Sequence, residues 1–206
     1  MQEPEPTTDG RTLRALRTRE AIVDATIALV EEGDLRPTAP RVAERAGVSV
    51  RSIFQHFTDL ESLHAAVAER LATRLIALVL PIPPDLPFED RLIRFVRQRG
   101  ILLEALTPLR RAADVHGPFS DEITARLRDG QAFLRREIQV TFAPELQAAG
   151  EEHDELLDAL DVCLSWGTWH ELRTRHERGQ AEAEAVVRRL VAAVVASIAH
   201  GAARAS

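Results

Sequence analysis

The sequence predicts an all-α protein, with a small N-terminal domain of three helices followed by a larger helical domain. Apolar residues recur at helical spacing along most of the 206 residues, and no segment alternates as strands do. The segment TAPRVAERAGVSVRSIFQHF, residues 38–57, has the form of two short helices joined by a tight turn. We therefore predict a disordered acidic tail at 1–10, a helix-turn-helix domain at 11–60 and a second helical domain at 61–206.

The composition is that of a globular protein, with 45% hydrophobic and 28% charged residues. No run reaches the about 18 consecutive apolar residues that a membrane-spanning helix needs, so we expect no membrane association. The first residues lack the basic start and apolar stretch of a secretory signal, which predicts a cytoplasmic protein. Cys163 is the only cysteine and excludes an intrachain disulfide.

Two helices are predicted before the turn. The first runs over residues 18–32 and ends at Gly33, and its apolar face would brace the helices that follow. The second begins at Thr38, a favourable N-cap, and tolerates Pro40 in its first turn. Gly47 ends this helix at the position where a left-handed conformation costs least.

The third predicted helix is capped by Ser49 and has a polar leading edge. Ile53, Phe54 and Phe57 are apolar, whereas its other positions are mostly polar, namely Val50, Arg51, Ser52, Gln55 and His56. A short helix of this kind suits insertion into the major groove of DNA.

The remaining chain is predicted to be helical between proline-rich and glycine-rich breaks. Thr58-x-x-Glu61 has the form of a capping box, so we expect a helix to begin at Thr58. The segment PIPPDLP, residues 81–87, must end it. Further helices are predicted at 88–106, 108–115, 119–142, 152–177 and 180–200.

Charge is unevenly distributed along the chain. The net charge is −6, yet residues 11–57 contain eight arginines and six acidic residues, a local net charge of +2. This asymmetry would orient the protein on a polyanion. All 26 basic residues are arginine, which suits phosphate and guanine recognition, but a composition bias of the source genome explains it more simply.

The N-terminal motifs also resemble a known family. RTREAIVDATIALVEEGDLRPT, AERAGVSVRSIFQHF and DLESL follow one another as in TetR-family transcriptional regulators, from about Arg17 to Leu63. Beyond this region only the layout of helices is similar. The resemblance implies a homodimer that binds a pseudo-palindromic operator in double-stranded DNA, usually as a repressor, and releases it when a small-molecule effector occupies the larger domain.

The resemblance assigns DNA contacts to specific positions. Arg51 and Gln55 are the strongest candidates for direct reading of bases. Phe54 replaces a tyrosine that usually binds phosphate, and Leu60 replaces a common phosphate-binding lysine. The full set of expected DNA-binding residues is Arg17, Thr38, Ser49, Val50, Arg51, Ser52, Phe54, Gln55 and His56.

Two of these assignments have alternatives. The arginines that precede or open the first helix, Arg11, Arg14, Arg17 and Arg19, form either a DNA-contacting arm or a solvated tail. His56 has either a structural role, which we favour, or a phosphate contact.

The C-terminal helices carry the predicted dimer interface. We expect the two helices to be unable to bury their apolar faces alone, so that a second copy covers them in a four-helix interface. The alternative is packing within one subunit. The residues are Val187, Leu190, Val191, Val194, Val195 and Ile198 on one helix, and Leu156, Leu157, Leu160, Cys163 and Leu164 on the other.

Aromatic residues on the middle helices are candidates for an effector pocket with few polar groups. The alternative is that they form the core, or that the two tryptophans serve the dimer. The candidates are Phe95, Arg99, Leu103, Phe119, Phe133, Trp166, Trp169 and His170.

The sequence contains no motif of an enzyme, and we expect neither a cofactor nor a metal site. A phosphate-binding glycine loop, a Gly-x-Ser-x-Gly elbow and a His-Glu-x-x-His motif are all missing from the chain. The competing interpretation is an all-helical dimeric interaction or ligand-sensing module with weakened DNA binding.

Overall fold

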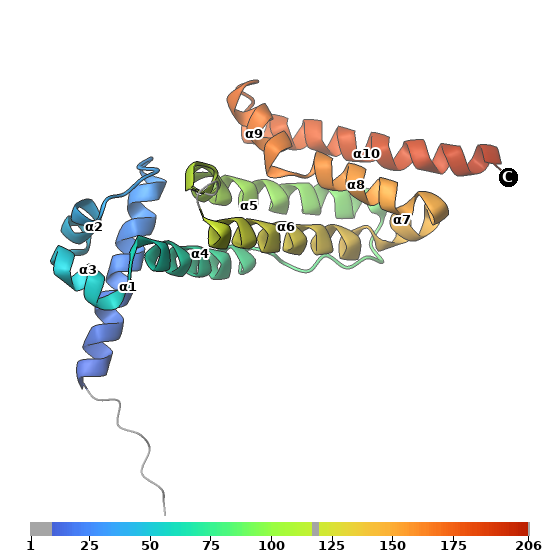
Figure 1. Cartoon of the computed structure of the whole chain (residues 1–206). Coiled ribbons are helices and arrows are strands. Elements are labelled where there is room, and N and C mark those ends of the chain that lie inside the picture. Colours follow the sequence, from blue (N-terminus) through green and yellow to red (C-terminus); the bar gives the residue numbers. More distant parts are fainter. Residues whose placement is uncertain (1–9, 117–119, 206) are drawn as a thin grey trace, which may run out of the picture. The chain divides into compact units, whose positions relative to one another are not determined.

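The computed structural model describes residues 10–116 and 120–205, and every regular element in these ranges is a helix (Figure 1). The all-α prediction is therefore confirmed. The elements are α1 (Gly10–Glu31), α2 (Ala39–Ala46), α3 (Val50–His56), α4 (Leu60–Ile76), α5 (Phe88–His116), α6 (Asp121–Thr141), α7 (Ala143–Ala148), the 3₁₀ turn η2 (Gly150–Glu152), α8 (His153–Cys163), α9 (Trp166–Thr174) and α10 (Gln180–Ala205).

The helices form two compact units. The described residues of Met1–Thr73 and Pro108–Arg126 belong to the first, and those of Arg74–Thr107 and Leu127–Ser206 to the second. We predicted a domain boundary at residue 60. The division by packing differs from it, because α4, α5 and α6 each contribute to both units.

The first unit has its own hydrophobic core. Ile22 of α1, Ile53 of α3 and Leu63 of α4 are at most 1% exposed and belong to one cluster. Val42 of α2 is fully buried in the same cluster, so all four N-terminal helices share it. Each side chain lies on the apolar stripe of its helix, which is why the periodicity of the sequence located these helices.

The second unit is built around Phe142, which follows α6 and is fully buried. Its ring lies 5.2 Å from the ring of Phe95 in an edge-to-face arrangement and 6.2 Å from that of Phe88. Leu160 of α8 and Val191 of α10 complete the same cluster at 0% exposure. The core of this unit thus unites α5, α6, α8 and α10.

The predicted break at Thr107-Pro108 does not occur, because α5 continues through Pro108 as one helix. A proline inside a helix removes one backbone hydrogen bond and costs about 3 kcal/mol. Residues on both sides of Pro108 are buried, including Leu103 and Ala112, and their burial outweighs that cost.

The helix predicted at 152–177 is in fact two helices, α8 and α9. Ser165 has an extended backbone, and its hydroxyl accepts the N–H of Thr168 at 3.1 Å, so it caps a new helix. The short helix α7 was not predicted. The capping box is also displaced by one residue, because Asp59 and Ser62 exchange these bonds at the start of α4, not Thr58 and Glu61.

The apolar stripes of the C-terminal helices are largely buried within one chain. Leu156, Leu157, Leu160, Leu164, Val187 and Val191 are all at most 3% exposed. The two helices do not bury these faces alone, as expected, but α5 and α6 of the same chain share the cluster with them, so these residues need no second copy to cover them. Leu190 remains 40% exposed, and the side chain of Ile198 lies outside the described residues.

Candidate nucleic-acid interface and ligand site

The turn between α2 and α3 is fixed by backbone chemistry. Thr38 is the N-cap residue of α2, although its side chain makes no capping bond. Gly47 ends α2 in the left-handed conformation, with φ 67°. The N–H of Val48 then donates to the carbonyl of Ala43 at 3.0 Å. Because L side chains are strained in this conformation, glycine sets the direction in which the chain leaves α2.

Helix α3 begins at the predicted residue, because the hydroxyl of Ser49 accepts the N–H of Ser52 at 3.1 Å. Ile53 and Phe57 point into the core, with exposures of 0% and 3%. The opposite face is exposed and carries Val50, Arg51, Phe54 and Gln55. This pattern gives α3 one anchored face and one free face, as a helix that reads a groove requires.

The exposed face of α3 has a free cation at its centre. The side chain of Arg51 forms no hydrogen bond or ion pair with any described residue. Its guanidinium is thus available to a phosphate or to the edge of guanine. Val50 and Phe54 lie beside it with 38% and 49% exposure and offer apolar contacts.

Contacts with α1 and with Glu32, the residue that follows it, hold α2 and α3 in place. The guanidinium of Arg19 lies 5.0 Å from the ring centre of Phe57, a cation–π contact at the end of α3. Arg45 of α2 donates two hydrogen bonds to the carboxylate of Glu32, and this pairing lowers the pKa of Glu32. Arg19 therefore has a structural contact that the sequence did not indicate.

The remaining DNA-binding candidates lie on the same unit. Arg17 is exposed on α1, so this part of the supposed arm is helical. Ser52 and His56 are half-buried, and the structure does not decide between the two roles of His56. The acidic tail predicted at 1–10 lies outside the described residues except for Gly10, which opens α1.

Arg36 and Arg41 are further candidates that we did not select from the sequence. Both are exposed near the N-terminus of α2, and Arg41 forms an ion pair of 2.7 Å with Asp34. Their position just before and just inside a helix N-terminus was the available signal, because such sites attract phosphate.

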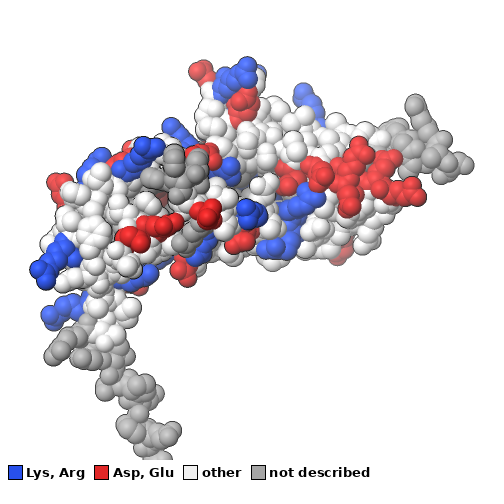
Figure 2. All heavy atoms as spheres, in the orientation of Figure 1, with Lys and Arg blue, Asp and Glu red and all other residues white. Residues whose placement is uncertain are grey.

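The surface charges differ between the units. Figure 2 shows basic side chains on the surface of the first unit and a dense acidic region over η2 and α8. Exposed acids there are Glu151, Glu152, Asp154, Glu155 and Asp158. The acidic region over η2 and α8 would therefore repel a polyanion.

Three of the eight ligand-site candidates are apolar core residues of the second unit. Phe95, Leu103 and Trp169 are at most 2% exposed. Gly100 lets the Trp169 ring approach α5, since a Cβ there would lie 2.7 Å from it. The indole N–H of Trp169 donates to Glu104 at 3.0 Å.

Other candidates lie apart from these. Trp166 stacks on His170 with ring centres 4.4 Å apart and donates to the hydroxyl of Thr107. Phe133 is half-buried and lines neither of the hollows described next, and Phe119 lies outside the described residues.

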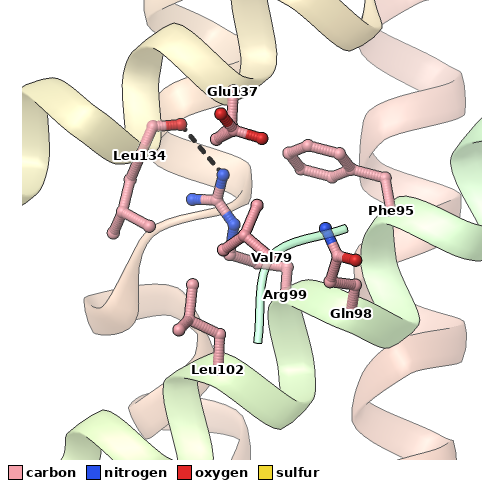
Figure 3. Close-up of a pocket in the computed structure, with 7 residues that line it drawn as sticks. All are labelled: Val79, Phe95, Gln98, Arg99, Leu102, Leu134 and Glu137. Carbon is pink, nitrogen blue, oxygen red and sulfur yellow. Dashed lines mark hydrogen bonds between the residues drawn. The ribbon is translucent and has the colours of Figure 1, made fainter. Parts of the chain in front are cut away.

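Two hollows border Arg99, which is 5% exposed. The first, of about 210 Å³ including the space at its mouth, is lined by Val79, Phe95, Gln98, Arg99, Leu102, Leu134 and Glu137 (Figure 3). The second, of about 180 Å³, is lined by Val96, Arg99, Leu103, Cys163, Leu164, Ser165, Trp169 and Val187.

Arg99 is held by few contacts. Its Nη2 donates to the carbonyl of Leu134 at 2.9 Å, and its guanidinium lies 4.8 Å from the ring centre of Phe95. Burial lowers the pKa of Arg99 to about 10, although attraction by Asp161 and Glu137 opposes this. The side chain is therefore a buried cation at neutral pH.

No group of three or more histidine, cysteine, aspartate or glutamate side chains within the described residues could hold a metal ion. Within the same ranges, no helix has the length and apolar character needed to cross a membrane.

The fold and the free face of α3 define a helix-turn-helix DNA-binding protein. Residues 22–67 match the model of the family described as bacterial regulatory proteins, tetR family. The N-terminal helices are therefore similar to the DNA-binding domain of this family, which supports a DNA-binding transcriptional regulator.

Solved structures share this fold. A protein from Mesorhizobium loti MAFF303099, assigned to the TetR family of transcriptional regulators, superposes with a TM-score of 0.67 at 21% identity, over 89% of this chain and 98% of its own. A transcriptional regulator from Rhodococcus sp. Rha1 gives a TM-score of 0.66 at 16% identity, over 89% and 96% of the two chains. No curated protein sequence matches the chain.

Proposed function

We propose that this regulator is a cytoplasmic homodimeric repressor, which binds a pseudo-palindromic operator and leaves it when a small apolar or amphipathic molecule occupies the second unit. The observation that carries the DNA-binding part is the free face of α3 around Arg51, opposite the buried Ile53 and Phe57. Capping by Ser49 and the left-handed Gly47 support a rigid presentation of this face.

The predicted DNA contacts follow from the exposure of each residue. Arg51 and Gln55 read base edges, and Val50 and Phe54 contact sugars or thymine methyl groups. Thr38, Ser49, Ser52, His56 and Arg17 are the proposed contacts to the backbone. Phe54 has no hydroxyl and Leu60 no charge, so backbone affinity depends more on the arginines of α1.

The dimer is proposed to form through α8 and α10. Val162 of α8 is 65% exposed and Leu190 of α10 is 40% exposed, so apolar side chains on these helices are left for a partner. A second copy would place two α3 helices about 34–36 Å apart, one turn of DNA. Leu190→Glu should leave the protomer folded, because the side chain is outside the core, and should shift sedimentation toward the monomer. An unchanged dimer would place the interface elsewhere.

The test of DNA binding begins with selection of bound duplexes from a random pool, followed by measurement of affinity across a salt series. We expect a pseudo-palindromic sequence whose affinity falls steeply as salt rises. Enrichment of no sequence, with weak binding even at low salt, would favour the helical interaction module instead.

A matched pair of variants separates base reading from general charge. Arg51→Ala should cost about 1–3 kcal/mol of binding free energy and relax specificity at one position. Arg97→Ala removes the same charge from an exposed site on α5 of the second unit and should leave affinity unchanged. An equal loss on every sequence would assign Arg51 to phosphate.

The sign of regulation needs a separate readout. A reporter gene placed behind the selected operator should be less active when the protein is present, and deletion of the operator should remove this effect. Increased reporter activity would identify an activator.

A further inference from the structure

Phe54 differs from the other large aromatic residues of this protein because it faces the solvent. It is 49% exposed, whereas every other phenylalanine or tryptophan side chain that the structure describes is buried or half-buried. Neither Phe54 nor Val50, which is 38% exposed one turn earlier in α3, belongs to the hydrophobic core of the first unit. An aromatic ring stabilises a protein mainly through the apolar surface that it buries. Much of the Phe54 ring is thus left for contact with another molecule.

Val50 and Phe54 form an apolar edge along the exposed face of α3. Successive residues of a helix are about 100° apart, so residues four apart in the sequence lie on the same side. Arg51 and Gln55 are also four apart and exposed, and they form a polar edge directly beside the apolar one. The exposed face therefore offers two neighbouring edges of different chemistry, one apolar and one that donates hydrogen bonds.

The major groove of DNA presents partners for both edges. Guanine offers two acceptors to a guanidinium, and that of Arg51 has no partner among the described residues. Thymine offers its C5-methyl group, which is the apolar group that base pairs expose in this groove. The apolar edge is therefore matched by a thymine, as the polar edge is matched by a guanine.

The deoxyribose ring is the other apolar surface of DNA that is available to Phe54. A contact with sugar positions a protein on DNA but carries no sequence information directly. The place of Phe54 on α3 favours the base instead. Around the helix its side chain lies between those of Val50 and Arg51, so a guanidinium that reaches a base edge brings the ring to the base edges as well.

The two bases should be close together in the operator. Arg51 and Phe54 are three residues apart, which is about 4.5 Å along the axis of a helix. Neighbouring base pairs of DNA are about 3.4 Å apart. The two side chains therefore meet bases that are at most about two base pairs from one another.

We propose that Phe54 and Val50 read the methyl group of a thymine that lies within about two base pairs of a guanine read by Arg51, once in each half-site of the operator. This inference rests on the proposed DNA binding and names the base that the apolar edge selects. It gives Phe54 a role in specificity, in place of the phosphate contact that a tyrosine usually makes at this position.

The test removes the methyl group from the DNA and the ring from the protein, first separately and then together. Each thymine in one half-site of the selected operator is replaced in turn by uracil, which pairs identically but lacks the C5-methyl group. At one thymine the full-length protein should bind the uracil duplex about four-fold more weakly, which is the factor that burial of one methyl group contributes.

Variants assign this penalty to the apolar edge. Phe54→Ala should bind the uracil and thymine duplexes equally at that position, because the ring that contacts the methyl group is gone. Val50→Ala should reduce the penalty. Val140→Ala, which removes an exposed apolar side chain from α6, should retain the full penalty. Phe54 lies outside the core, so Phe54→Ala should unfold at the same temperature as the wild type.

A repeated selection with Arg51→Ala tests the pairing of the two bases. The preference for guanine within about two base pairs of this thymine should be lost, whereas the preference for the thymine should persist. A guanine preference that survives in Arg51→Ala, or that lies farther from the thymine, would contradict the proposed arrangement.

The proposal is refuted if no uracil substitution weakens binding, or if the penalty is as large in Phe54→Ala as in the wild type. The second result would place the Phe54 ring against a sugar. In both cases the operator is still bound, so the proposed DNA-binding function stands. Selection of no operator at all would instead refute the proposed function, and this inference with it.

Discussion

Gly100 and Gly130 offer a direct test of the packing of the second unit, because both are helical glycines in very different surroundings. A Cβ on Gly100 would lie 2.7 Å from Cη2 of Trp169 and 3.2 Å from its Cζ2. A Cβ on Gly130, in α6, would have no neighbour within 4 Å. Alanine at either position should gain up to about 1 kcal/mol from helix propensity.

The Trp169 ring cannot move away easily to accommodate a methyl group on α5. It is 2% exposed, and its indole N–H is bonded to Glu104. Overpacking of this kind costs about 1–3 kcal/mol. Gly100→Ala should therefore be less stable than the wild type by about 1 kcal/mol, whereas Gly130→Ala should be more stable by about 0.5–1 kcal/mol.

The measurement is urea unfolding of both variants and the wild type, followed by circular dichroism at one protein concentration, with tryptophan fluorescence as a second probe. Fixed concentration matters because association contributes to the stability of a dimer. If Gly100→Ala proves as stable as Gly130→Ala, then Trp169 does not pack against α5 as described. The second hollow, which Trp169 lines, would then also need a different description.

Further predictions concern the turn between α2 and α3 and the buried ion pair of Arg91 with Glu145. Gly47→Val should weaken operator binding and stability through strain at φ 67°, whereas Gly47→Asn should be tolerated better; equal effects would contradict the left-handed turn. Ser49→Ala should cost about 1 kcal/mol in thermal unfolding, and Thr38→Ala much less, because only Ser49 makes a capping bond. Arg91→Met should destabilise the protein by about 3–5 kcal/mol, since it leaves the Glu145 carboxylate without its partner; a loss below about 1 kcal/mol would show that the pair is well solvated.

Local signals in the sequence located α2, α3 and the turn between them well. Gly47 and Ser49 act through their own backbone and side-chain chemistry, so their roles depend little on distant residues. The alternation of buried and exposed positions on α3 likewise follows from helical periodicity. Arg19 could not be assigned this way, because its contact with Phe57 joins residues far apart in the chain.

The errors share one cause, which is that tertiary packing overrides local preference. Pro108 marks a break by its own chemistry, yet burial on both sides keeps α5 continuous. Ser165 is a residue type that favours helix starts, and it caps α9. We did not predict this start, because the apolar pattern continues on both sides of Ser165. The stripe of Val187 and Val191 showed that these residues would be buried, without showing by which chain.

The sequence alone thus determined the helical class, the three N-terminal helices and which residues of α3 are exposed, because these depend on interactions within a few residues of one another. The tertiary structure alone decided which apolar residues are core, and it gave two arginines of α5 very different partners. Arg91 meets the carboxylate of Glu145, 54 residues away, whereas Arg99 meets only a carbonyl and an aromatic ring. Whether a charge finds its partner depends on contacts between distant segments, and these exist only once the chain has folded.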